Sequence, residues 1–103
     1  MELTIQSLHF TSNKELNNFV TEKVNRLSHF YDKIESAQVC LKLDKSDNTD
    51  NKICEIRLVV PGNDLFAKRQ CKTFEEATNE TVDALQQQIK RMKSKFDNQW
   101  LKE

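Results

Sequence analysis

The sequence predicts an α+β fold: a two-layer sandwich in which a four-stranded sheet carries both helices on one face. Four short segments alternate between apolar and polar residues, as strands with one buried face do. Two longer segments carry apolar residues at spacings of three and four, which is typical of amphipathic helices. These segments follow one another in the order β-α-β-β-β-α within 103 residues, a length that suits one domain.

The first strand and the first helix are predicted within the N-terminal third of the chain. Residues 2–8 alternate between apolar and polar side chains and predict a strand. A helix is expected to begin near Ser12, because Ser12 and Glu15 have the spacing of a capping box. We expect it to end near residues 31–32. Its apolar stripe comprises Leu16, Phe19, Val20, Val24, Leu27, Phe30 and Tyr31.

Two further strands are predicted in the middle of the chain, over residues 36–44 and 53–60. Both alternate, and the polar residues 44–51 between them indicate a hairpin loop. The side chains expected on the buried face are Val39, Leu41 and Leu43 in one strand and Cys54, Ile56, Leu58 and Val60 in the other.

The fourth strand is predicted over residues 65–72, after a turn at Pro61-Gly62-Asn63-Asp64. Leu65, Ala67 and Cys71 fit an inward face. Arg69 falls at an inward position and breaks the alternation, so the pattern here is weaker.

A long second helix is predicted over residues 74–97, opened by a capping box between Thr73 and Glu76. Its inward side is expected to carry Ala77, Thr81, Leu85, Gln88, Ile89, Met92 and Phe96. Residues 1–97 are therefore expected to form one domain, and residues 98–103, which include Trp100, a short tail.

No pattern of reactive residues indicates an enzyme. His9 and His29 lie in no recognisable catalytic motif, and the sequence has no Gly-x-Ser-x-Gly, His-Glu-x-x-His or P-loop pattern. Cys40, Cys54 and Cys71 form no Cys-x-x-Cys pair and lack metal-ligand spacing. We therefore expect no catalytic residue, no metal, no cofactor and no small-molecule substrate.

The N-terminal sequence and the apolar runs indicate where the protein is found. The N-terminus has neither the basic start nor the apolar stretch of a signal peptide. The longest strongly apolar run is Leu58-Val59-Val60, too short to span a membrane. An odd number of cysteines favours reduced thiols. These features predict a cytoplasmic protein without a membrane partner.

The cations are clustered, although sixteen basic and sixteen acidic residues give a net charge of zero. The last helix carries acids in its first half and cations in its second, an order that also suits the helix macrodipole. If the two helices are neighbours, the clusters could form one surface that attracts phosphates. The three clusters are Lys90, Arg91, Lys93 and Lys95; Lys68, Arg69 and Lys72; and Lys23, Arg26 and Lys33.

Three segments carry a resemblance to a known family. The run from Phe19 to Ile34 contains a Lys-x-x-Arg-Leu-x-x-Phe-Tyr-Asp string, and Val39–Leu43 and Thr73–Ala77 follow it in order. Together they resemble the ribosome hibernation-promoting factor / ribosome-associated inhibitor A family, also labelled sigma-54 modulation protein. The resemblance covers about residues 1–96. It implies a fold similar to that of double-stranded-RNA-binding domains.

The resemblance also implies a function and a set of partners. It implies docking on ribosomal RNA between the head and body of the small ribosomal subunit. The 70S ribosome, which contains this subunit, is also an implied partner. There the protein would overlap the messenger RNA and transfer RNA sites and silence translation during starvation. The short C-terminal tail favours the hibernation-promoting subtype. Whether the protein acts together with a separate partner that dimerises ribosomes stays open.

The RNA-binding residues carried over from the family are Lys23, Arg26, Lys42, Lys90, Arg91, Lys93 and Lys95. Family members often carry Lys or Arg where this chain has Ala84 and Gln87. We expect Lys68, Arg69 and Lys72 to compensate for these two missing cations.

Two alternatives remain open beside a ribosome-binding translation silencer. The first is a protein-interaction module or homodimer of the same fold, in which an exposed Phe66 and Trp100 contact the partner without RNA binding. The second is a small-molecule enzyme, which no group of reactive residues supports.

Overall fold

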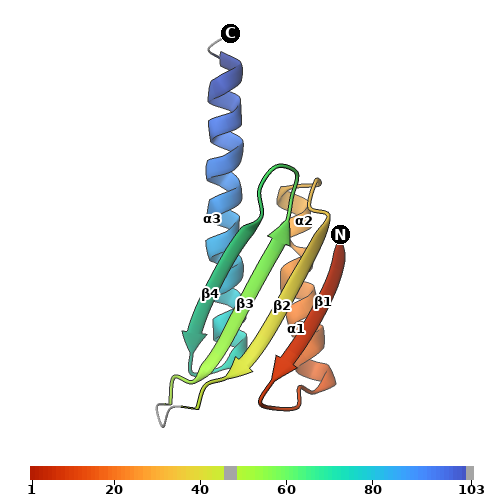
Figure 1. Cartoon of the computed structure of the whole chain (residues 1–103), viewed down its shortest axis with the longest axis vertical. Helices are drawn as coiled ribbons and strands as arrows, with labels where there is room; N and C mark the ends of the chain where they lie inside the picture. Colours follow the sequence, from red (N-terminus) through yellow and green to blue (C-terminus); the bar gives the residue numbers. More distant parts are fainter. Residues whose placement is uncertain (46–48, 102–103) are drawn as a thin grey trace.

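Seven helices and strands make up the described part of the protein (Figure 1). The computed structural model describes residues 1–45 and 49–101, with side chains described for residues 1–45 and 49–94. Residues 46–48 of the predicted hairpin loop therefore lie outside the described residues. The elements are β1 (Glu2–Leu8), α1 (Lys14–Asn25), α2 (Leu27–Phe30), β2 (Ser36–Leu43), β3 (Lys52–Val59), β4 (Leu65–Cys71) and α3 (Phe74–Leu101).

The four strands form one mixed sheet in the order β1-β2-β3-β4. β1 and β2 are parallel, and the other two pairs are antiparallel. Figure 1 shows the helices on one face of this sheet, which confirms the predicted two-layer β-α-β-β-β-α fold. One row of paired residues crosses the covered face: Ile5 pairs with Val39, Val39 with Ile56, and Ile56 with Ala67. The other face of the sheet, here called the open face, carries no helix.

The core lies between the sheet and the apolar stripes of the helices. Leu27 of α2 and Leu85 of α3 are fully buried, and they pack in one cluster with the covered face of the sheet. Among the described side chains, the predicted stripes are buried or half-buried except at Phe30, which is 41% exposed. The side chain of Phe96 lies outside the described residues. Removal of this apolar surface from water is the main favourable term in the folding of a domain of this size.

Of the N-terminal caps predicted for α1 and α3, only the cap of α3 is the predicted residue. Asn13, not Ser12, caps α1: its Oδ1 accepts a hydrogen bond from the Leu16 backbone N–H at 2.8 Å. The prediction was wrong by one residue because Asn and Ser cap helices about equally well. The cap of α3 is confirmed, since Thr73 Oγ1 accepts from the Glu76 N–H at 3.0 Å.

The strand limits agree with the predicted ones to within one residue, whereas the helices differ from the prediction in two further places. The first predicted helix is divided by a turn at Arg26, whose carbonyl accepts the His29 N–H at 3.1 Å, three residues on. α3 continues to Leu101, beyond the predicted end at residue 97. The predicted division into a domain of residues 1–97 and a tail of residues 98–103 stays a prediction.

Two buried threonines of α3 face Cys54 of β3. Thr81 Oγ1 lies 2.6 Å from the Ala77 carbonyl oxygen and 3.2 Å from that of Cys54. Thr78 Oγ1 donates to Cys54 Sγ at 3.8 Å. In the described part of the chain, every buried side-chain nitrogen and oxygen has a hydrogen-bond partner. Burial raises the pKa of the Cys54 thiol to about 11.

Replacement of Leu85 by Ala should lower the free energy of unfolding by about 2–5 kcal/mol, because it removes a fully buried side chain and leaves a cavity. Urea denaturation followed by circular dichroism measures the loss. The control is Gln87→Ala on the exposed side of the same helix, expected to change stability by less than about 0.5 kcal/mol. Equal losses in the two variants would contradict the assigned core.

The Cys54 thiol should make folding less stable at alkaline pH. The pKa of this thiol is higher in the folded protein than in the unfolded chain. Its contribution to the free energy of unfolding is therefore complete below the unfolded pKa and is lost as pH rises toward about 11. We expect Cys54→Val to remove a decline of roughly 2 kcal/mol between pH 8 and pH 10.5. Urea denaturation of both proteins across this range measures it, and parallel declines would count against the burial of this thiol.

Candidate nucleic-acid interface

The cations in the second half of α3 lie on two different flanks of the helix. Lys93 Nζ donates to the Phe30 carbonyl oxygen at 2.9 Å, so its flank faces the end of α2. Gln88 Nε2 donates to the Phe66 carbonyl oxygen at 2.9 Å, so the opposite flank faces β4. Because helix positions three apart share a flank, Lys90 lies with Lys93, and Arg91 lies with Gln88. The cations of the predicted cluster therefore lie on two sides of the helix and do not form one patch.

The flank of α3 that faces α1 and α2 carries exposed cations. Lys90 and Lys93 are both exposed, and neither forms an ion pair among the described residues. Their backbone lies in the well-packed part of α3, beside the buried Ile89. This flank, defined by Lys90 and Lys93, is called the α2 flank below.

The two predicted cations of the first helical segment lie in the same layer, since α1 and α2 both pack against α3. The Lys23 ammonium lies 5.4 Å from the centroid of the Phe19 ring. Arg26 lies in the turn between α1 and α2 and pairs with Glu22 at 3.6 Å. Both members of this ion pair are more than half exposed, so the pair leaves Arg26 free to exchange Glu22 for a phosphate.

The flank of α3 that faces β4, here called the β4 flank, has mixed charge. Arg69 and Arg91 line one hollow together with Glu80 and Asp83. Arg69 points to the helix side of β4, as its place between the buried Ala67 and Cys71 requires. The irregular position of Arg69 in the strand pattern is thereby explained: β4 is an edge strand, and a long side chain can leave the core there.

The remaining predicted cations lie elsewhere. Lys68 lies on the open face and is exposed, on the side of β4 opposite to Arg69. Lys72 is exposed between β4 and α3. The Lys68, Arg69 and Lys72 cluster is thus not gathered on one face. The side chain of Lys95 lies outside the described residues.

Lys42 also lies on the open face, where it is neutralised by a neighbour. Its Nζ lies 2.7 Å from Glu55 Oε2 on the adjacent strand. The hydrogen bond that Lys42 donates to Glu55, together with the negative charge of this carboxylate, raises the pKa of Lys42. Lys68 lies opposite Glu55 in the register of the other strand pair. This carboxylate reduces the attraction of the open face for phosphates.

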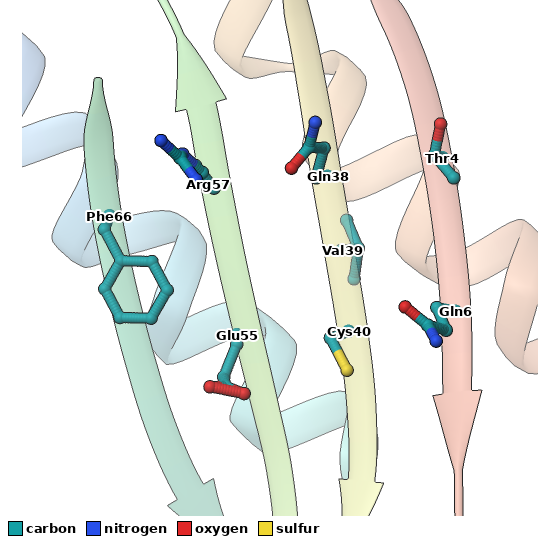
Figure 2. A pocket seen from close by; sticks show the side chains of 8 residues that line it. All are labelled: Thr4, Gln6, Gln38, Val39, Cys40, Glu55, Arg57 and Phe66. Atoms are coloured by element: carbon teal, nitrogen blue, oxygen red, sulfur yellow. The ribbon is translucent and has the colours of Figure 1, made fainter. Parts of the chain in front are cut away.

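A shallow hollow lies at the centre of the open face (Figure 2). Figure 2 shows side chains from all four strands around it, with the Phe66 ring at one side. Phe66 is 53% exposed. Arg57 beside it is held by Asp64, with Nη2 at 2.6 Å and Nε at 2.8 Å from the same Oδ2. The residues that line the hollow are Thr4, Gln6, Gln38, Val39, Cys40, Glu55, Arg57 and Phe66.

Another hollow lies where α1 and α3 begin, and it is acidic. Phe10 and Phe74 stack there with ring centroids 4.4 Å apart and planes 16° apart. Glu15 and Glu75 lie at its edge with Phe19. These carboxylates would repel a phosphate, so this end of the molecule does not suit a polyanion.

The cysteines occupy the positions that strand alternation predicts. Cys40 lies on the open face, while Cys54 and Cys71 are buried on the helix side. The Cys71 thiol donates to Glu80 Oε2 at 3.1 Å, and burial together with this carboxylate raises its pKa to about 11. A thiol with so high a pKa is a poor nucleophile near neutral pH. Among the described residues, no three His, Cys, Asp or Glu side chains gather as metal ligands would.

Within the described part of the chain, no helix contains an apolar stretch long enough to cross a membrane.

Comparison with known proteins identifies relatives over most of the chain. Residues 3–97 match the family model described as "Sigma 54 modulation protein / S30EA ribosomal protein". The ribosome hibernation promoting factor of Pseudomonas putida is 30% identical over 95 residues, which cover 92% of this chain and 89% of that protein. That of Escherichia coli K12 is 27% identical over 96 residues, covering 93% and 97% of the two chains.

A solved structure has the same fold. A ribosomal subunit interface protein from Coxiella burnetii superposes with a TM-score of 0.81 at 16% identity, over 91% of this chain and 99% of that one. The match over residues 3–97 and the identity to the Pseudomonas protein together show that this chain belongs to the sigma-54 modulation protein / S30EA ribosomal protein family, a family of non-enzymatic ribosome-binding proteins that includes the ribosome hibernation promoting factors.

Proposed function

We propose that this protein silences translation by docking on the RNA of the small ribosomal subunit through cations of its helix layer. The observation that carries the proposal is the α2 flank, where Lys90 and Lys93 are exposed and unpaired among the described residues. Lys23 and Arg26 extend the contact along α1. Docking would take place in the cytoplasm, between the head and body of the subunit and in the 70S ribosome, and would occlude the messenger RNA and transfer RNA sites.

Phosphate binding through this flank follows from simple electrostatics. A lysine that contacts a phosphate releases counterions from the RNA, and the free energy of binding then depends on salt. Double-stranded RNA is recognised mostly by its shape and backbone, which needs cations at fixed spacings rather than side chains that read bases. A helix anchored by a buried stripe holds the Cβ atoms of its lysines at such spacings, about 5–6 Å for positions three or four residues apart.

The names of similar proteins support the ribosome as the partner. The names of the Pseudomonas and Escherichia proteins describe ribosome hibernation, and the Coxiella protein is named for the interface between ribosomal subunits. A separate ribosome-dimerising protein is a further partner that we propose for this chain only by that analogy.

The two flanks of α3 should differ in their effect on ribosome binding. We expect Lys90→Glu/Lys93→Glu to weaken binding to small subunits at least tenfold and to lower the slope of log affinity against log salt by about 0.7–0.9 for each phosphate that the variant no longer binds. Arg69→Glu/Arg91→Glu should have a smaller effect, because Glu80 and Asp83 already share that hollow. Co-sedimentation with 30S subunits and 70S ribosomes across a salt series measures both.

The matched control is Lys14→Glu/Lys45→Glu, which reverses two exposed charges outside the proposed interface. It should bind like the unaltered protein. If this control loses as much affinity as the α2-flank variant, only overall charge matters and the assigned surface is wrong. If the unaltered protein fails to sediment with ribosomes at low salt, the proposed function fails. Phe66 on the open face would then be the first residue to test for a protein partner or a homodimer.

A further inference from the structure

A fourth hollow, here called the end pocket, lies at one end of the sheet where three segments meet. It is lined by Tyr31 and Lys33 before β2, by Pro61–Asn63 in the β3–β4 turn, and by Met92 and Lys93 of α3. Figure 1 shows the turn and the α2 helix at the same end of the sheet, beside α3. Its volume of about 390 Å³ falls within the range of small-molecule sites.

The chemistry of the end pocket combines apolar contact with positive charge. Tyr31 is half-buried and packs against the core, so its ring is held in place, and Met92 is held in the same way. Lys33 and Lys93 supply two ammonium groups, and no carboxylate is among the residues that line the pocket. Asn63 adds an amide that can both donate and accept hydrogen bonds.

The position of the Lys93 ammonium is fixed by a neighbour. Its Nζ donates to the Phe30 carbonyl oxygen at 2.9 Å, directly before Tyr31 in the chain. Two of its three N–H groups remain for a ligand. In the turn that lines the same pocket, Gly62 has a φ of +92°, which favours glycine, and the space over its Cα is open. A ligand can therefore approach the turn without meeting a side chain at this position.

The other three hollows do not share this combination. The hollow on the open face holds Glu55 and an arginine already bound to Asp64. The hollow between the starts of α1 and α3 holds two glutamates, and on the β4 flank the two arginines share their hollow with Glu80 and Asp83. Of the four, the end pocket alone offers an aromatic ring and cations without an acidic side chain.

We propose that the end pocket binds one nucleoside 5′-phosphate. The base would lie against the Tyr31 ring and Met92, and Asn63 would hydrogen-bond its edge. Lys33 and Lys93 would hold the phosphate. Stacking of a base on an aromatic side chain contributes to binding whatever the base, and cations add attraction for the phosphate.

Two sources of such a group exist: an unpaired nucleotide of ribosomal RNA, and a free nucleotide. If the source is RNA, this inference rests on the proposed function. It then names a contact that differs in kind from the phosphate contacts of the α2 flank, because an unpaired base is bound by stacking as well as by charge.

The first experiment is a titration of the isotope-labelled full chain with adenosine 5′-monophosphate, followed by amide NMR shifts. We expect saturable shifts at Gly62, Asn63 and Lys93, with adenosine alone and inorganic phosphate alone each binding about tenfold more weakly, since each makes only part of the contacts. Absence of shifts at these residues up to 10 mM, about the weakest binding of interest, would overturn the proposal. Equal shifts with inorganic phosphate would also overturn it, in favour of a simple anion site.

Variants test the assigned residues. Lys33→Gln keeps the fold, because Lys33 is exposed, and should weaken nucleotide binding about three- to tenfold. Tyr31→Leu removes the stacking ring while retaining apolar contact with the core, and should abolish the difference between the nucleotide and inorganic phosphate. The matched control is Lys14→Gln, an exposed lysine at the start of α1 that should change nothing. Equal binding by Lys33→Gln and the control would contradict the pocket assignment.

Ribosome co-sedimentation of the same variants separates the two sources. Weaker sedimentation of Lys33→Gln than of Lys14→Gln identifies an RNA nucleotide as the occupant. Unchanged sedimentation, together with impaired nucleotide binding, identifies a free nucleotide. Failure of the unaltered protein to sediment would remove the proposed function and leave the nucleotide site standing, so the two failures are distinguishable.

Discussion

The burial of the apolar stripe of α3 is the constraint on which the other features depend. Leu85 is fully buried and Ile89 is 1% exposed against the covered face of the sheet, which fixes the rotation of the helix about its axis. The directions of the exposed side chains of α3 are then fixed as far as residue 94, where the described side chains end. Lys93 reaches the end of α2, and Arg91 reaches the β4 side, because the stripe leaves them no other direction. Core packing therefore determines which cations of α3 lie together in the candidate interface.

Residue patterns predicted the fold well because both helix and strand periodicity report directly on burial. The strand limits agree with the structure to within one residue, and Thr73 was the correct cap of α3. The cap of α1 was misplaced because two good capping residues, Ser12 and Asn13, stand side by side. The break at Arg26 has no Pro or Gly to announce it, so the pattern of apolar residues continued through it.

The candidate site was less predictable, because it depends on which residues meet across the fold. Sequence neighbours Lys68 and Arg69 point to opposite sides of β4. The pairing of Lys42 with Glu55 follows from the register of β2 against β3, which no local pattern contains. The end pocket joins three segments that are distant in the sequence. Its two lysines belong to separate charge clusters, and no spacing in the chain indicates that they line one pocket.

The charge separation along α3 gives the molecule an electric dipole without a net charge. Glu75 and Glu76 lie in its first turn, and Lys90 and Lys93 lie about four to five turns further on, in a molecule whose longest extent is 54 Å. A polyanion attracts a neutral dipole over a shorter range than it attracts a net cation, because the charge–dipole attraction falls off faster with distance. The dipole turns in the field as it comes within about a Debye length, ~8 Å at physiological salt. Encounter with such a surface is therefore accelerated little over long range. Orientation is selected in the last steps of approach, with the acidic end directed outward.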